Sequence, residues 1–206
     1  MEEMLLNGYE LLCTLLPAAL LCLYVSCRGR DTGLPAMTGR QLAGLALLGA
    51  YMAAVFHVTG AGTIFDALSY GVRAGGGEVN LIPFSQEIDM LGYALNVAMT
   101  APLGFLMPQL WPELRRPART AAAGFAVSLC IELSQLCNHR STDVDDLLLN
   151  TLGALAGYAA FVLLSRVIKL GNKSPAVGAW AYLGALFAGH FLLFAELLVA
   201  GRLYGF

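Results

Sequence analysis

Charged side chains are scarce in this sequence, and the shortage limits the kind of protein that it can encode. They make up 13% of the 206 residues, while hydrophobic residues reach 58%. Soluble globular domains contain about 25% charged residues, which cover the surface that faces water. The composition therefore excludes an ordinary soluble domain. It predicts an all-α protein that forms one integral membrane domain over residues 1–206.

Signatures of common catalytic and metal sites are also missing. The sequence contains no His-Glu-x-x-His, no Gly-x-Ser-x-Gly and no Cys-x-x-Cys, and its five cysteines lie in apolar segments. His57 and His190 are isolated in the sequence and are expected to be core residues. Cations occur in groups of three beside apolar segments, without a basic and aromatic patch, so nucleic-acid binding is not expected. The sequence thus predicts no cofactor and no metal site.

Long apolar segments are what the chain has in place of these features. A membrane-spanning helix needs about 20 predominantly apolar residues. Six segments meet this requirement: residues 5–27, 41–59, 91–110, 120–137, 147–168 and 177–200. We therefore predict a polytopic transmembrane helical bundle of about six spans.

Lysine and arginine are distributed unevenly among the loops that join these spans. Nine of the twelve cations lie in three alternate loops: Arg28, Arg30, Arg40, Arg115, Arg116, Arg119, Arg166, Lys169 and Lys173. Cytoplasmic loops of membrane proteins are rich in lysine and arginine. These three loops are therefore assigned to the cytoplasm, and both termini and most of the acidic residues to the extracytoplasmic side.

Polar side chains inside the predicted spans gather toward the extracytoplasmic face. At a rise of about 1.5 Å per residue, they lie on the order of 5–8 Å below that boundary. This group consists of Glu10, Asn96, Glu132, Asn150 and Glu196. The other half of the spans offers mainly serine and threonine hydroxyls, which can bond to their own helix. A transport route needs polar groups on both sides of the midplane, so the asymmetry favours an outward-facing cavity.

The densest polar group joins the fourth and fifth predicted spans. Glu132 and Gln135 are three residues apart and share a helix face. A short turn with Arg140 follows, and one of the aspartates in residues 143–146 is expected to cap the next span, where a carboxylate complements the helix dipole. Asn150 then begins a stripe of small residues that allows close helix packing. The pattern predicts a tight helical hairpin.

Several motifs in this order resemble the VanZ-like family of membrane proteins. They are Asn80-Leu-Ile-Pro83-Phe84, Asn96 with the segment 101–108, Glu132-x-x-Gln135, and Arg140-x-x-Asp143-x-x-Asp146-x-x-x-Asn150-x-x-Gly153-x-x-x-Gly157. The resemblance covers roughly residues 40–170, the VanZ-like core. It implies a bacterial plasma-membrane protein of the cell envelope. The family takes its name from a member that lowers susceptibility to teicoplanin, a lipidated glycopeptide antibiotic.

Three functional hypotheses follow from these residues. In the first, an outward cavity binds a lipid head group, a lipid-linked wall precursor or a lipoglycopeptide, with Arg140 on a phosphate or carboxylate. In the second, the protein is an intramembrane enzyme acting on a polyprenyl phosphate or glycolipid, with Glu132 as general acid or base helped by Gln135. Asp143 and Asp146 would then either bind a divalent cation or orient Arg140. In the third, it is a non-catalytic scaffold. The candidate ligand-binding residues are Asn80, Asn96, Glu132, Gln135, Arg140, Asp143, Asp146 and Asn150.

Overall fold

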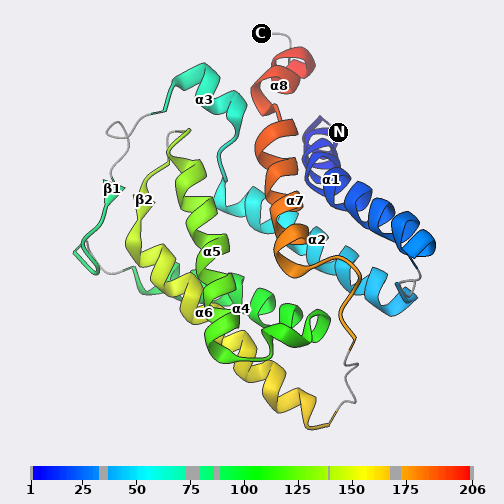
Figure 1. The fold of residues 1–206 in the computed structure, drawn as a ribbon. Helices are drawn as coiled ribbons and strands as arrows, with labels where there is room; N and C mark the ends of the chain where they lie inside the picture. Colours follow the sequence, from blue (N-terminus) through cyan, green and yellow to red (C-terminus); the bar gives the residue numbers. More distant parts are fainter. Residues whose placement is uncertain are drawn as a thin grey trace.

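The computed structural model describes residues 2–32, 37–72, 79–85, 89–138, 140–167 and 173–204. This part of the chain is helical apart from two strands of two residues each, which confirms the predicted all-α class (Figure 1). The elements are α1 (Glu2–Thr32), α2 (Gly39–Thr59), α3 (Ile64–Tyr70), β1 (Val79–Asn80), α4 (Met90–Leu110), the 3₁₀ turn Pro112–Leu114, α5 (Pro117–Gln135), β2 (Thr142–Asp143), α6 (Val144–Ser165), α7 (Ala179–Leu193) and α8 (Glu196–Tyr204).

Four stretches of this chain are long and apolar enough to cross a membrane. They are Glu3–Gly29, Gly39–Ser69, Met90–Leu110 and Val144–Ser165, and they contain α1, α2, α4 and α6. The predicted count of six would also require α5 and α7 to cross. Helix α5 has 19 residues but includes Arg119, Glu132 and Gln135, and α7 has only 15 residues. The structure therefore supports a multi-pass membrane protein with four clear spans among the described residues.

The last predicted span is divided where the sequence gives no sign of a break. Helix α7 ends at Leu193, and α8 begins at Glu196. The hydroxyl of Tyr9 in α1 donates to the Leu193 carbonyl oxygen at 2.8 Å and accepts from the Ala195 amide at 3.3 Å. Backbone groups at the end of a helix need outside partners. A tyrosine far away in sequence thus provides two of these partners at the point where residues 177–200 divide into two helices.

Glycines bring α6 close to α4, as the predicted stripe of small residues requires. A Cβ atom on Gly153 would collide with Val97 and Thr100 of α4, and one on Gly157 would collide with the Ala101 carbonyl group. Close backbone approach at small residues is a common way for membrane helices to associate. Helix α5 packs mainly on α6, and α1 packs mainly against α7.

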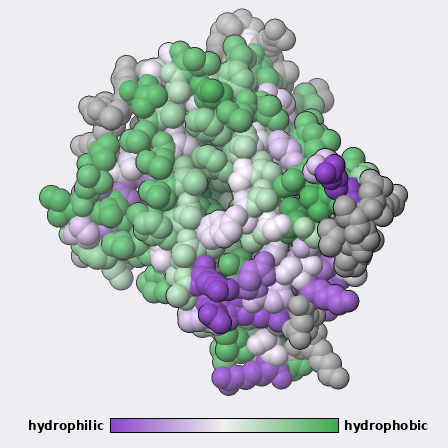
Figure 2. Space-filling view, in the orientation of Figure 1, coloured by the Kyte–Doolittle hydropathy of each residue, from purple (hydrophilic) through white to green (hydrophobic). Residues whose placement is uncertain are grey.

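A hydrophobic core lies where α2, α4 and α7 meet. Leu48, Met107, Trp111 and Leu186 are fully buried there. The Trp111 indole donates a hydrogen bond to the Val177 carbonyl oxygen at 3.0 Å. A buried indole requires such an acceptor, and this bond joins the end of α4 to the segment that leads into α7. The face of the molecule seen in Figure 2 is largely hydrophobic, and most of its hydrophilic residues gather in its lower part.

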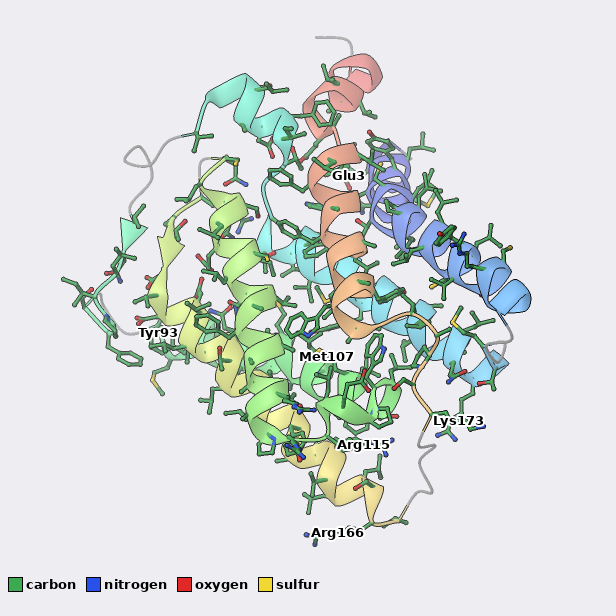
Figure 3. The ribbon with its side chains drawn as sticks, in the orientation of Figure 1. Glu3, Tyr93, Met107, Arg115, Arg166 and Lys173 are labelled. Carbon is green, nitrogen blue, oxygen red and sulfur yellow. The ribbon has the colours of Figure 1, made fainter. Side chains whose placement is uncertain are left out.

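The bundle has two distinct ends. Arg115, Arg166 and Lys173 lie at the lower end of Figure 3, which we call the cationic end, and Glu3 lies toward the opposite end. Helices α3 and α8 and the start of α1 also lie at that opposite end (Figure 1). This arrangement agrees with the alternation of charged loops, although Arg73, Glu78, Glu87 and Lys169 fall outside the described residues. The assignment of the cationic end to the cytoplasm stays a prediction.

Candidate functional site

The hairpin of α5 and α6 is fastened by its own polar side chains. Asp143 caps α6 by accepting from the Asp145 amide at 2.8 Å, which confirms that an aspartate begins this helix. Glu132, which is 5% exposed, accepts from the Asp143 amide at 3.1 Å. The Thr142 hydroxyl donates to the Glu132 carbonyl oxygen at 3.3 Å. Glu132 therefore ties the end of α5 to the start of α6.

The segment 79–85 folds onto the aspartates of this hairpin. Strands β1 and β2 pair in parallel, and the Asn80 amide donates to both carboxylate oxygens of Asp143 at 3.2 Å. Asp145 is 2% exposed and accepts from the Phe84 amide at 2.9 Å and the Tyr93 hydroxyl at 2.7 Å. We call Glu132, Asp143, Asp145 and Asp146 the acidic hairpin cluster. Two of its members, Asp143 and Asp145, hold the segment 79–85 against the hairpin.

Two predicted amide residues complete this region. The Asn96 amide in α4 donates to the Asp146 carboxylate. The Asn150 amide donates to the Ser128 hydroxyl at 2.9 Å, and its own oxygen is buried without a partner. The structure thus brings together six of the eight predicted ligand-binding residues: Asn80, Asn96, Glu132, Asp143, Asp146 and Asn150. The side-chain amides of Asn80, Asn96 and Asn150 thus already donate to protein acceptors.

Gln135 and Arg140, the other two predicted residues, lie on a different side of the hairpin. The Gln135 amide donates to the Thr59 carbonyl oxygen at 2.9 Å, at the end of α2. Arg140 packs against Gly60, whose φ of +60° is left-handed and where a Cβ atom would collide with the guanidinium. Residues three apart on a helix differ by about 60° in direction. Glu132 and Gln135 can therefore face α6 and α2 respectively, so the expected single site is divided in two.

A pocket of about 470 Å³ opens on the Arg140 side. It lies among the start of α1, the end of α2, the start of α3, the hairpin turn and the α7–α8 break. We call it the mixed-charge pocket because of its charged and titratable lining residues, which are Glu10, His57, Asp66, Arg140, His190 and Glu196. Leu6, Phe56 and Phe194 add apolar surface. Arg140 is the member of this lining that the sequence identified as ligand-binding.

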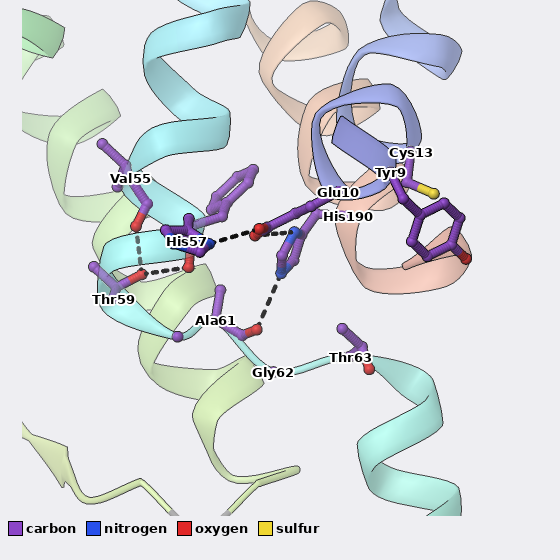
Figure 4. A network of polar contacts seen from close by, with 12 residues as sticks. Tyr9, Glu10, Cys13, Val55, His57, Thr59, Ala61, Gly62, Thr63 and His190 are labelled. Atoms are coloured by element: carbon purple, nitrogen blue, oxygen red, sulfur yellow. Dashed lines mark hydrogen bonds and ion pairs between the residues drawn. The ribbon is translucent and has the colours of Figure 1, made fainter. Parts of the chain in front are cut away.

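Glu10 connects both histidines of the pocket (Figure 4). Its carboxylate lies 2.7 Å from His57 Nδ1 and 3.7 Å from His190 Nδ1. His190 is 1% exposed, and its Nε2 lies 3.0 Å from the Ala61 carbonyl oxygen. A carbonyl oxygen only accepts, so Nε2 carries the hydrogen in this contact. The histidine ring is therefore oriented with Nδ1 toward Glu10.

The sequence prediction for the two histidines was correct in one case and wrong in the other. His190 is a buried residue, as expected, but the His57 side chain is 56% exposed at the pocket. Neither is isolated, because both meet Glu10. The sequence contained one relevant signal: Glu10 and His57 were both placed near the outer end of their spans. Depth alone does not say which helices are neighbours, so the contact between them was missed.

Arg140 is exposed and is not ion-paired with any carboxylate that the structure describes. The two close contacts of a carboxylate with a basic side chain found in this part of the chain join Glu10 to a histidine. The Arg140 amide, rather than its guanidinium, bonds to the Asn138 side chain at 3.0 Å. Asp66 and Glu196 line the same pocket. The pocket can therefore offer a guanidinium to an anionic group and carboxylates to a cationic group of one ligand.

Comparison with known proteins identifies the family. A family model described as VanZ/LLP1 matches residues 42–165. No curated protein and no solved structure matches the chain. The matched stretch contains the acidic hairpin cluster and Arg140, whereas Glu10, His190 and Glu196 lie outside it. Because the match covers more than half of the chain, this protein belongs to the VanZ/LLP1 family.

Proposed function

We propose that the mixed-charge pocket binds the head group of an envelope lipid, a lipid-linked wall precursor or a lipoglycopeptide. The observation that carries this proposal is the exposed guanidinium of Arg140, which faces a pocket of about 470 Å³ without a carboxylate partner among the described residues. A ligand phosphate or carboxylate would provide that partner. Arginine is suited to the task because its planar fork can donate two parallel hydrogen bonds.

The other charges favour a ligand that also carries an amine. Three carboxylates line the pocket, on Glu10, Asp66 and Glu196. An ammonium group would lie among them while the anionic group meets Arg140. Leu6 and Phe194 lie at the same pocket and offer apolar surface to the adjoining lipid chain. The proposed ligand is thus an amphiphile with a head group of both charges, held on the extracytoplasmic side of the bacterial plasma membrane.

The acidic hairpin cluster has a positioning role in this proposal. Glu132 fastens the hairpin turn that carries Arg140, and Asn80 fastens the segment that covers Asp143. Gln135 and Asn138 attach the end of α5 to the corner after α2. The side-chain amides of Gln135 and Asn138 thus position the turn that carries Arg140, and the ligand binds the Arg140 guanidinium directly.

The test is lipid binding by the purified full chain, measured by native mass spectrometry in detergent. The probes are phosphatidylethanolamine, phosphatidylglycerol, an undecaprenyl-linked wall precursor and teicoplanin. We expect binding of at least one amine-bearing probe and a loss of roughly tenfold in affinity for Arg140→Gln, since a hydrogen-bonded charge pair contributes about 1.5–3 kcal/mol. Arg166→Gln, at the opposite end, is the matched control. Failure of every probe to bind, or equal binding by Arg140→Gln and the parent, would overturn the proposal.

A cellular measurement extends the proposal to resistance. Expression of the parent in a teicoplanin-susceptible bacterium should raise the inhibitory concentration of teicoplanin more than expression of Arg140→Gln does. Membrane levels of both proteins must match in this comparison. Equal inhibitory concentrations for the parent and an empty vector would remove teicoplanin from the set of ligands.

A further inference from the structure

A second pocket lies at the cationic end, away from the mixed-charge pocket. Its volume is about 530 Å³, and it lies between the start of α2 and the end of α4. We call it the cationic pocket because Arg40 and Lys173 line it and, among the described residues, no acidic side chain does. Figure 3 shows Lys173 near the start of α2. The described linings of the two pockets therefore differ in charge: three carboxylates and Arg140 line one, and two cations without an acid line the other.

The two cations are accessible and have no ion pair in the part of the chain described. Both side chains are exposed, and the ion pairs found involve Glu10 and histidines. Gln41 links the segment of Lys173 to the start of α2, because the Gln41 side-chain amide donates to the Lys173 backbone carbonyl oxygen at 3.1 Å. Gln41 is itself held in the capping box of Thr38 at the start of α2. The local fold thus holds the backbone of Lys173 against the start of α2, which carries Arg40.

The pocket changes from polar to apolar along α2, and α4 adds the apolar residues Leu106 and Leu110 on either side of Gln109. On α2, Arg40 and Gln41 are followed by Gly44 and Leu47, so that Leu47 lies about 9 Å deeper than Gln41 at ~1.5 Å per residue. Leu47 is 58% exposed, although it lies next to a cavity. This gradient matches a molecule with an anionic head and a hydrocarbon chain that points into the bilayer.

We propose that the cationic pocket binds one anionic phospholipid. The phosphate lies between Arg40 and Lys173, and an acyl chain runs along Leu47 and Leu106. Two cations near a membrane surface each add about 1 kcal/mol of attraction for an anionic lipid. The proposal does not depend on the function assigned to the mixed-charge pocket, because the two pockets share no lining residue.

Native mass spectrometry of the purified full chain can test this site. The probes are phosphatidylglycerol and phosphatidylcholine with identical acyl chains, and inorganic phosphate. The parent should bind phosphatidylglycerol roughly tenfold more tightly than phosphatidylcholine. The double variant Arg40→Gln/Lys173→Gln should lose this preference. The matched control Arg116→Gln/Arg166→Gln removes two exposed cations that do not line the pocket, and it should keep the preference.

Each alternative result overturns the proposal. Equal loss in both double variants would mean that overall surface charge, and not the pocket, selects the lipid. Competition by millimolar inorganic phosphate would identify a free-anion site in place of a lipid site. Equal binding of phosphatidylglycerol and phosphatidylcholine by the parent would show that the cationic pocket does not select an anionic lipid. Arg140→Gln should retain the phosphatidylglycerol preference, so failure here is distinguishable from failure of the proposed function.

Discussion

The acidic hairpin cluster and the mixed-charge pocket are neighbours on the α5–α6 hairpin, yet they use polar residues in opposite ways. In the cluster, Asp145 is buried and accepts two hydrogen bonds from other segments. In the pocket, Arg140 is exposed and has no carboxylate partner among the described residues. Bonded buried groups stabilise a fold, whereas accessible charges remain free for a ligand. Substitutions in the cluster should therefore change stability, and substitutions in the pocket should change binding.

The largest effect is expected for Asp145→Ala. The substitution leaves the Phe84 amide and the Tyr93 hydroxyl without their acceptor, so the free energy of unfolding should fall by about 3 kcal/mol. Asp145→Asn keeps an acceptor oxygen and should lose less. Chemical unfolding in mixed micelles measures both values, and limited proteolysis should show faster cleavage near residues 79–85. If Asp145→Ala had the same free energy of unfolding as the parent, the acidic hairpin cluster would not stabilise the fold, and its contrast with the mixed-charge pocket would be wrong.

Gly60→Ala tests the junction of the two regions. Gly60 has a left-handed φ of +60°, and a Cβ atom there would collide with the Arg140 guanidinium. A left-handed conformation costs about 1–2 kcal/mol for a residue with a Cβ atom. The free energy of unfolding should fall by that amount, and ligand affinity should fall with it because Arg140 is displaced. Gly184→Ala is the control, since nothing lies within 4 Å of a Cβ atom at that position.

A smaller effect is expected for Tyr9→Phe, at the contact of α1 with the α7–α8 break. The hydroxyl bonds to the Leu193 carbonyl oxygen and the Ala195 amide at the α7–α8 break. Its removal should lower the free energy of unfolding by about 1 kcal/mol. Amide hydrogen exchange should become faster at Ala195 while the middle of α7 keeps its protection. Unchanged exchange at Ala195 would show that the break does not depend on α1.

The same residues show how far the sequence could predict this molecule. Local patterns were sufficient for the helices α1, α2, α4, α5 and α6, the aspartate cap of α6 and the stripe of small residues at Gly153 and Gly157, because each pattern lies within a short stretch of sequence. The family followed from motif order. The meeting of Glu10 with His57 and His190, and the break at Leu193, depend on which helices are neighbours. Periodicity and hydropathy do not contain that information, so these features required the three-dimensional structure.

The smallest stability effect, close to zero, is expected for Arg140→Gln. This variant should separate ligand binding from stability most clearly. Substitution of an exposed side chain outside a bonded network usually changes the free energy of unfolding by less than about 0.5 kcal/mol. The guanidinium of Arg140 is in that situation, since its backbone amide makes the bond to Asn138. Unfolding should therefore match the parent while ligand affinity falls. If Arg140→Gln instead destabilised the protein as much as Asp145→Ala, Arg140 would act as another fastening of the hairpin, and the scaffold hypothesis would explain both regions.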